Sequence, residues 1–411
     1  MKTLLSFFIL MTLSNVVIAQ TTTIPDPIFE SILISRGYDS GTPDGLVLTN
    51  SIDTITQLTI QGGAAGSGTT IADLTGIEDF IALESLNCHD NNLTSLNLSQ
   101  NTALSSLNCY NNQLTTIDIS QNTSLTWLAC YSNQLTTLEV SQNTTLGYLR
   151  CNDNQLTTLN INQNIALWSL LCSNNQLTTL DLIQNTALTN FICDNNQLTT
   201  LDVSQNTLLS TLYCYNNLIT TLDVNQNTAL AYLWCHYNQL TTLDVSQNVV
   251  LRKFNCSNNQ LTCLNMKNGN NHNIVADFGF GTDFSANNNP NLTCIEVDNV
   301  AYATTSWSSI DVQSSFSSSC PNPCTVGIKE NSLSNISLYP NPTTKNFTID
   351  LGEVKTTIKT TLTNSLGQVI LRQQFESTDI INVEIDAPKG IYFLQLETSS
   401  GELITRKIIK E

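Results

Sequence analysis

Nine cysteines of this 411-residue chain stand 21 residues apart, and no spacing in the series is missed. A fixed period of this length indicates one supersecondary unit stacked on copies of itself, because a single unit cannot bury its apolar face alone. The middle of the chain is therefore predicted to be a solenoid, whose function would belong to a surface made by many repeats. The cysteines of this column are Cys88, Cys109, Cys130, Cys151, Cys172, Cys193, Cys214, Cys235 and Cys256.

Each repeat carries apolar residues at fixed positions. In the repeat 104–124, LSSLNCYNNQLTTIDISQNTS, these positions are 1, 4, 6, 11, 14 and 16. The alternation at positions 4 and 6 predicts a short strand with one buried face, and stacked copies predict a parallel sheet with strands about 4.8 Å apart. The second half of the repeat is too short for a helix and rich in β-branched residues, so we expect extended structure there too. About ten repeats would give a slim rod on the order of 50 Å long.

Two columns of asparagine follow the same period. Position 9 is Asn in every regular repeat, at the point where the chain must turn away from the strand. An amide side chain can satisfy backbone groups in that turn and in a neighbouring repeat. A second column at position 19 predicts the opposite turn. The position-9 residues are Asn91, Asn112, Asn133, Asn154, Asn175, Asn196, Asn217, Asn238 and Asn259.

The spacing Leu104-x-x-Leu107-x-Cys109-x-x-Asn112-x-Leu114 resembles the leucine-rich repeat signature, with cysteine at its third apolar site. The short repeat is similar to those of bacterial members such as the internalins. This resemblance implies a mainly β fold, a leucine-rich repeat solenoid with a parallel sheet and little helix. The cysteine column is then best interpreted as small buried hydrophobes. The alternative, a metal or redox array, would need tight local clusters of ligands rather than one thiol per repeat.

The other four cysteines, Cys263, Cys294, Cys320 and Cys324, break the period and are predicted to form disulfides at the open end of the solenoid. Aligning 254–266 with 284–297 places Cys263 and Cys294 on successive repeats. Four cysteines allow three pairings. The first choice is Cys263–Cys294 with Cys320–Cys324, and the rival joins Cys294 to Cys320.

The chain before the repeats predicts a signal peptide and a cap. Residues 1–19 combine Lys2, an apolar run and a small-residue cleavage site at Ala19, which is typical of a secretory signal. Residues 20–82 are expected to hold the N-terminal cap and an irregular first repeat. Within them a short helix should begin with Asp26 as N-cap and Pro27 in the first turn. The solenoid with its C-terminal cap is assigned to residues 83–324.

The sequence after the repeats follows a different pattern. Residues 325–335 are predicted to be a linker, and residues 336–411 lose the 21-residue period. This region resembles the C-terminal sorting domain of type IX secretion substrates in Bacteroidetes. The resemblance lies in Ile336-Ser-Leu-Tyr-Pro-Asn-Pro-Thr, in the strand from Gly390 and in the closing Arg406-Lys-Ile-Ile-Lys-Glu. The resemblance implies a small β-sandwich that the type IX secretion machinery reads, and a secreted or outer-membrane-surface protein. Such tails are usually removed as the protein is released or attached.

Charge and motif content exclude several function classes. The net charge of −18 argues against nucleic acid or anionic lipid as a partner, because both bind basic surfaces. After signal removal no integral membrane segment is expected. The three histidines are far apart and no hydrolase or phosphate-binding motif occurs. No catalytic residue, metal or cofactor is therefore predicted, and the acidic column at position 15 is expected to be solvated.

The outward positions of the predicted strands carry most of the aromatic residues. Tyr and Trp are typical of binding hot spots, because they are rigid and amphipathic. We therefore expect this face to bind a protein, peptide or glycan. The alternative is that neighbouring rings cover each other and only stiffen the sheet. The candidate binding residues are Tyr110, Trp127, Tyr131, Tyr148, Trp168, Tyr213, Tyr215, Tyr232, Trp234 and Tyr237.

Two other functions remain open at this point. The solenoid could be a structural rod that sets a distance on the cell surface. It could also bind ice or another crystal surface through flat threonine columns, which the repeats place at Thr115, Thr136, Thr157, Thr178, Thr199, Thr220 and Thr241.

Overall fold

The computed structural model describes residues 20–63, 70–274, 284–321, 324, 336–364, 367–398 and 403–411. The chain divides into two compact units, Met1–Cys324 and Thr325–Glu411. The predicted signal segment 1–19 and linker 325–335 lie outside the described residues. Each unit is described by itself. Within the described ranges no helix has the length and hydropathy required to cross a bilayer.

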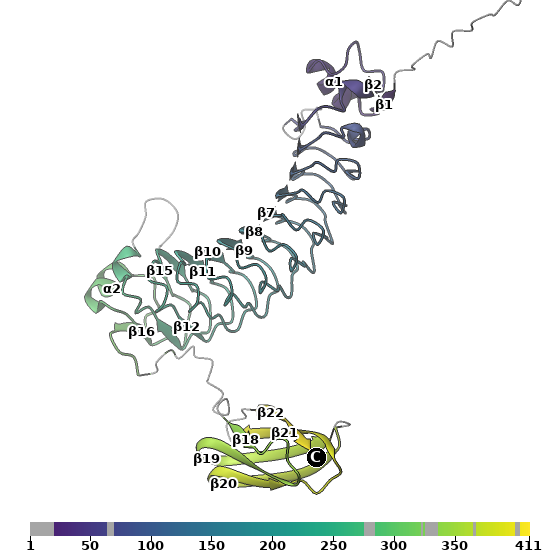
Figure 1. Ribbon diagram of the computed structural model, residues 1–411. Coiled ribbons are helices and arrows are strands. Elements are labelled where there is room, and N and C mark those ends of the chain that lie inside the picture. Colours follow the sequence, from purple (N-terminus) through teal and green to yellow (C-terminus); the bar gives the residue numbers. More distant parts are fainter. Residues whose placement is uncertain are drawn as a thin grey trace, which may run out of the picture. The chain divides into compact units, whose positions relative to one another are not determined.

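A long parallel sheet runs through the first unit on the inner side of its curve (Figure 1). Each strand pairs in register with the strand one repeat away, as Leu107 does with Leu128. In the described part of the chain the sheet has eleven strands, ordered β15-β13-β11-β10-β9-β8-β7-β6-β5-β4-β3. They are β3 (Gln57–Thr59), β4 (Ser85–Asn87), β5 (Ser106–Asn108), β6 (Trp127–Ala129), β7 (Tyr148–Arg150), β8 (Ser169–Leu171), β9 (Asn190–Ile192), β10 (Thr211–Tyr213), β11 (Tyr232–Trp234), β13 (Lys253–Asn255) and β15 (Phe284–Ser285).

The core is the stack of apolar positions that the period predicts. In the repeat 104–124, Leu104, Leu107, Cys109 and Leu114 are fully buried, and all nine cysteines of the column are buried and free. Burial raises the pKa of the Cys88 thiol to about 12. The mainly β solenoid and the buried position of the cysteine column are thus confirmed.

The outer side of the solenoid is extended, but it forms a sheet only near the C-terminal end. There β12 (Thr242–Asp244), β14 (Cys263–Asn265), β16 (Cys294–Glu296) and β17 (Ser315–Ser317) pair in parallel. Further along the rod the same side shows isolated parallel bridges, such as Asn97 with Asp118. The expectation of extended structure on both sides therefore holds, and in the described repeats nearer the N-terminal end the outer side pairs as β structure only through the bridges of Asn97 with Asp118 and of Glu139 with Asn160.

The position-9 asparagines join each repeat to the one before it. The Nδ2 of Asn112 donates to the carbonyl oxygens of Cys88 and Cys109 at 3.0 and 3.1 Å, and its Oδ1 accepts from the backbone N–H of Leu93 at 3.0 Å. The same contacts recur at the other position-9 residues. The amide thus pairs buried backbone groups that have no strand partner at this turn.

The position-19 asparagines perform the matching task at the opposite turn. Asn122 is fully buried, and its Nδ2 donates to the carbonyl oxygens of Leu98 and Asn101 at 3.0 and 2.9 Å. Both oxygens belong to the preceding repeat. Two columns of amides therefore fix the register of the stack, one at each turn.

The N-terminal cap contains the predicted helix, α1 (Pro27–Ser35). Asp26 is its N-cap, and Oδ1 of this residue accepts from the N–H groups of Ile28 and Phe29 at 2.9 and 3.1 Å. The buried Glu30 accepts from the N–H groups of Asp44 and Gly45. The cap also holds the antiparallel pair β1 (Thr21–Thr23) and β2 (Leu46–Leu48), with short 3₁₀ helices η1 (Thr49–Ser51) and η2 (Ile77–Asp79).

The C-terminal end of the solenoid is closed by η3 (Asn271–Asn273), by α2 (Val300–Ser306) and by two disulfides. Cys263 pairs with Cys324 and Cys294 with Cys320, at Cα–Cα distances of 5.4 and 5.9 Å. The first-choice pairing is therefore wrong, and the rival bond between Cys294 and Cys320 is the one formed. Cys263 and Cys294 do lie side by side on parallel strands, as Leu264 with Ile295 shows. Side chains in that arrangement point the same way instead of toward each other, which disfavours a bond between them.

The second unit is an antiparallel sheet. Its strands are β18 (Ser337–Tyr339), β19 (Asn346–Asn364), β20 (Val369–Glu384), β21 (Gly390–Thr398) and β22 (Leu403–Lys410). β18 pairs with the first half of β19, β21 pairs with the second half, and β20 pairs along both. Both halves of β19 bury side chains in one core, as Ile349 and Leu362 show.

Replacing Asn175 by Ala should destabilise the solenoid strongly. Its amide donates to the carbonyl oxygens of Cys151 and Cys172, both at 3.1 Å, and accepts from the N–H of Leu156 at 2.9 Å. Leaving buried backbone groups unpaired costs about 1–3 kcal/mol each, so we expect a loss of about 2–4 kcal/mol in denaturant unfolding. The exposed neighbour Gln176→Ala should change stability by less than about 0.5 kcal/mol. Equal effects of the two substitutions would contradict the bridging role of Asn175.

The cysteine column should be inert until the protein unfolds. Burial raises the thiol pKa, and alkylating reagents attack the exposed thiolate. Native protein treated with iodoacetamide at pH 8 should carry no label on these residues by mass spectrometry. After denaturation without a reductant, the nine free cysteines should all be labelled. Fewer than nine labels would mean that some of them form disulfides.

Candidate functional site

The outward side of the long sheet carries all ten predicted aromatic residues. In strand β6, for example, Leu128 is buried while Trp127 is exposed. Trp127, Trp168 and Tyr237 are the exposed members of the set, and the remaining seven are half-buried. Since all ten lie beyond the hydrogen-bonded backbone of the sheet, neighbouring side chains must cover the half-buried rings.

A first aromatic cluster lies over strands β4 to β8. Its position-7 rings are stacked, with 4.3 Å between the ring centroids of His89 and Tyr110 and 4.3 Å between those of Tyr110 and Tyr131. The guanidinium carbon of Arg150 lies 3.8 Å from the centroid of Tyr131 and closes this column with a cation–π contact.

A second column of the first cluster ends in an open indole. The Trp127 and Tyr148 rings are stacked with centroids 3.6 Å apart, and the Trp168 ring is tilted by 48° against Tyr148. Gly147 makes room for Trp168, because a Cβ there would lie 3.0 Å from two indole atoms. Trp168 is 46% exposed, so this end of the column is open to solvent.

A second aromatic cluster lies over strands β10 and β11. The Tyr213 and Trp234 centroids are 4.4 Å apart, as are those of Tyr215 and His236. The Trp234 and His236 rings meet nearly edge to face at 6.3 Å. Tyr232 lies on β11, the strand of Trp234, and is in register with Thr211 of β10. His236 is a member that sequence reasoning did not select, although it occupies position 7 like Tyr110 and Tyr131.

Tyr237 occupies a backbone position that favours asparagine. Position 8 of the repeats has a positive φ throughout, between 51° and 58°, and most residues there are Asn or Asp. Asn216, one repeat earlier, donates from Nδ2 to Oδ1 of Asn195 at 2.7 Å. Tyr237 keeps the same left-handed backbone, with φ 52°, and is 54% exposed. Its ring thus projects from the second cluster at a cost in backbone strain.

Between the two clusters, strands β8 and β9 present aliphatic and polar side chains. Leu171 and Ile192 are half-buried on the outward side. Beside them Asp194 is only 4% exposed, and its Oδ1 accepts from the Ser173 hydroxyl at 2.6 Å. Sequence reasoning missed Asp194 because position 7 is outward and its burial depends on neighbouring side chains.

Asp194 also acts on the second cluster. Burial and the Asp194 carboxylate raise the pKa of Tyr215 to about 12. Burial lowers the pKa of His236, and Asp194 opposes that shift. The second cluster therefore presents neutral rings at neutral pH.

The acidic column at position 15 belongs to turns. Oδ1 of Asp118 accepts from the N–H of Ser120 at 3.0 Å, and this hydrogen bonding lowers the pKa of the exposed carboxyl. Asp202 and Ser204 repeat the contact. Among the described residues no three His, Cys, Asp or Glu side chains come together as a metal site would require.

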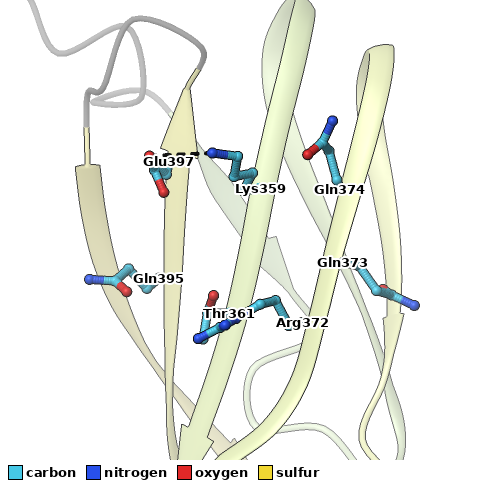
Figure 2. A pocket seen from close by; sticks show the side chains of 7 residues that line it. All are labelled: Lys359, Thr361, Arg372, Gln373, Gln374, Gln395 and Glu397. Carbon is cyan, nitrogen blue, oxygen red and sulfur yellow. Dashed lines mark ion pairs between the residues drawn. The ribbon is translucent and has the colours of Figure 1, made fainter.

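The second unit has a polar surface groove of about 540 Å³ over β19, β20 and β21 (Figure 2). Lys359 and Glu397 form an ion pair across two of these strands, with Nζ and Oε1 3.7 Å apart. The lining side chains are Lys359, Thr361, Arg372, Gln373, Gln374, Gln395 and Glu397.

Comparisons with known proteins found one matching family model and several similar solved structures. Residues 337–411 match the family model of the secretion system C-terminal sorting domain. The functional domain of InlJ from Listeria monocytogenes, described as including a cysteine ladder, aligns with 25% identity and a TM-score of 0.58, over 96% of this chain and 99% of that one.

Two other solved structures align with lower TM-scores. The internalin InlF from Listeria monocytogenes aligns at 23% identity and a TM-score of 0.46, covering 70% of this chain and 95% of that one. The leucine-rich repeat domain of APL1B aligns at 21% identity and a TM-score of 0.44, covering 53% and 69%. No curated protein is similar enough to this chain to count as a relative.

The cysteine column of the solenoid and the matched tail thus lead to one conclusion. The solenoid has an internalin-like leucine-rich repeat fold, and the chain carries a type IX secretion C-terminal sorting domain, as in Bacteroidetes, so it is secreted or held at the cell surface.

Proposed function

We propose that the solenoid is a recognition module whose aromatic sheet face binds an extracellular polypeptide. The observation that carries the proposal is the gathering of ten aromatic residues at the variable positions of one face, in two clusters with aliphatic side chains between them. Tyr and Trp bury large area at low entropic cost, which makes them frequent anchors in interfaces.

The stacking of the rings favours a polypeptide over a glycan. Inside each column the ring faces cover each other at centroid distances of 3.6–4.4 Å, so edges and hydroxyl groups point outward. A sugar ring needs an open aromatic face, which the column end at Trp168 offers more than the interior does. Edges and hydroxyls suit the mixed apolar and polar surface of a polypeptide. The rings inside each column therefore cover each other's faces. Recognition would use the ring edges along the columns and the open rings at the column ends.

The tryptophans provide the direct test. In the mature full chain, Trp127→Ala, Trp168→Ala and Trp234→Ala together should weaken binding to partners selected from displayed extracellular proteins and peptides by more than about 30-fold, because the loss of even one central aromatic anchor costs about 2 kcal/mol. Circular dichroism should show an intact solenoid. A glycan array run in parallel identifies a sugar ligand instead.

The matched control replaces three exposed threonines on the other side of the repeats, Thr136, Thr157 and Thr178, by Ala. Binding should not change. Unchanged binding of the tryptophan variant would refute the aromatic site and leave the spacer rod. Thermal hysteresis that the threonine variant loses would instead support crystal-surface binding.

Tyr237→Asn should stabilise the protein while weakening recognition. Asparagine suits the left-handed backbone and can join the amide column of Asn216, so we expect a gain of about 1 kcal/mol in thermal or denaturant unfolding. Tyr215→Asn, in the same cluster, should destabilise because it removes the stack on His236. If Tyr237→Asn leaves both stability and binding unchanged, the strained tyrosine has no role in the site.

A further inference from the structure

Asp194 is a buried carboxylate in the middle of the open face, between the two aromatic clusters. It is 4% exposed, although its position 7 points away from the core. Oδ1 accepts from the Ser173 hydroxyl at 2.6 Å and Oδ2 from the Asn195 amide at 2.7 Å. Burial and the Asp194 carboxylate raise the pKa of the nearby Tyr215 phenol, which is therefore neutral. Both hydrogen-bond donors, the Ser173 hydroxyl and the Asn195 amide, are neutral.

No positive charge balances this carboxylate within the described residues. Their ion pairs involve other carboxylates, such as Glu296 with Lys267. Arg150, on the same face, is held over the Tyr131 ring and donates from Nε to Oδ1 of Asn152 at 2.9 Å. A buried charge without a counter-charge is costly, which makes an outside cation favourable at this place.

The neighbouring histidine does not supply that cation. The His236 ring is stacked on Tyr215 with centroids 4.4 Å apart, and its Nδ1 is buried without a hydrogen-bond partner in the described structure. Burial lowers the pKa of this ring, which is therefore neutral at neutral pH. The carboxylate, by contrast, has about four acceptor sites, of which the Ser173 hydroxyl and the Asn195 amide use two, so about two remain.

We propose that Asp194 receives one lysine or arginine side chain of the polypeptide ligand. The half-buried Leu171 and Ile192 would cover the methylene stem, while the cationic head meets the carboxylate beside the rings of Tyr215 and Trp234. A net charge of −18 would attract such a basic partner over distance. This inference rests on the proposed recognition function and names the chemistry of its central contact.

The test uses the mature full chain and two small probes. Acetyl-arginine amide and its uncharged isostere acetyl-citrulline amide are titrated at low salt, with binding followed by chemical-shift changes. The arginine probe should bind at least tenfold more tightly than the citrulline probe. Asp194→Asn should remove that difference, because it keeps an acceptor oxygen but not the charge.

Asp202→Asn is the matched control, since Asp202 is an exposed carboxylate that serves a turn on the outer side. This variant should keep the full preference for arginine. Equal affinity for both probes in the wild-type chain would overturn the proposal even if Asp194→Asn failed to fold. Preference retained in folded Asp194→Asn would overturn it too.

The two proposals fail separately. If the tryptophan variant keeps its polypeptide partner while arginine is still preferred through Asp194, the aromatic recognition function is wrong. If the tryptophan variant loses its partner but arginine and citrulline bind alike, only the charge contact at Asp194 is wrong.

Discussion

An asparagine amide that spans two repeats is the contact on which the rest of the solenoid depends. The strand of each regular repeat has only three residues, and its ladder hydrogen bonds are too few to fix the stack alone. Asn112 and its equivalents pair the carbonyl and N–H groups that the strands leave at the turn. Because every repeat is bonded in the same way, corresponding side chains fall directly over one another. The buried cysteines and the stacked rings are both consequences of that register.

The same register explains how much could be predicted from the sequence. The period placed the buried positions, the two turns and the outward face, because each depends only on position within one repeat. The helix at Asp26 could be predicted from its capping residue and Pro27. These features are local or strictly repeated, and such features leave a pattern in a single sequence.

Features that depend on the path of the chain after the repeats, or on neighbouring side chains, could not be predicted. The disulfide partners follow from how the chain returns after β17, which brings Cys320 to Cys294 and Cys324 to Cys263. Asp194 was missed for a similar reason. Its position is an outward one, and its hydrogen bonds come from the preceding repeat, through Ser173, and from the adjacent Asn195. The aromatic face was found, but the stacking that leaves edges outward depends on the rotamers of adjacent rings.

The in-register stacking also fixes the distances between side chains along the solenoid. The distance from the Trp168 end of the first cluster to Tyr213 is set by the number of repeats between them, and each repeat contributes about 4.8 Å. Loss or duplication of a single 21-residue segment would alter that spacing by one step and leave every remaining contact of the core in place. Under the proposed recognition function, a change in repeat number would alter the distance that a partner must span to contact both clusters, at little cost in stability.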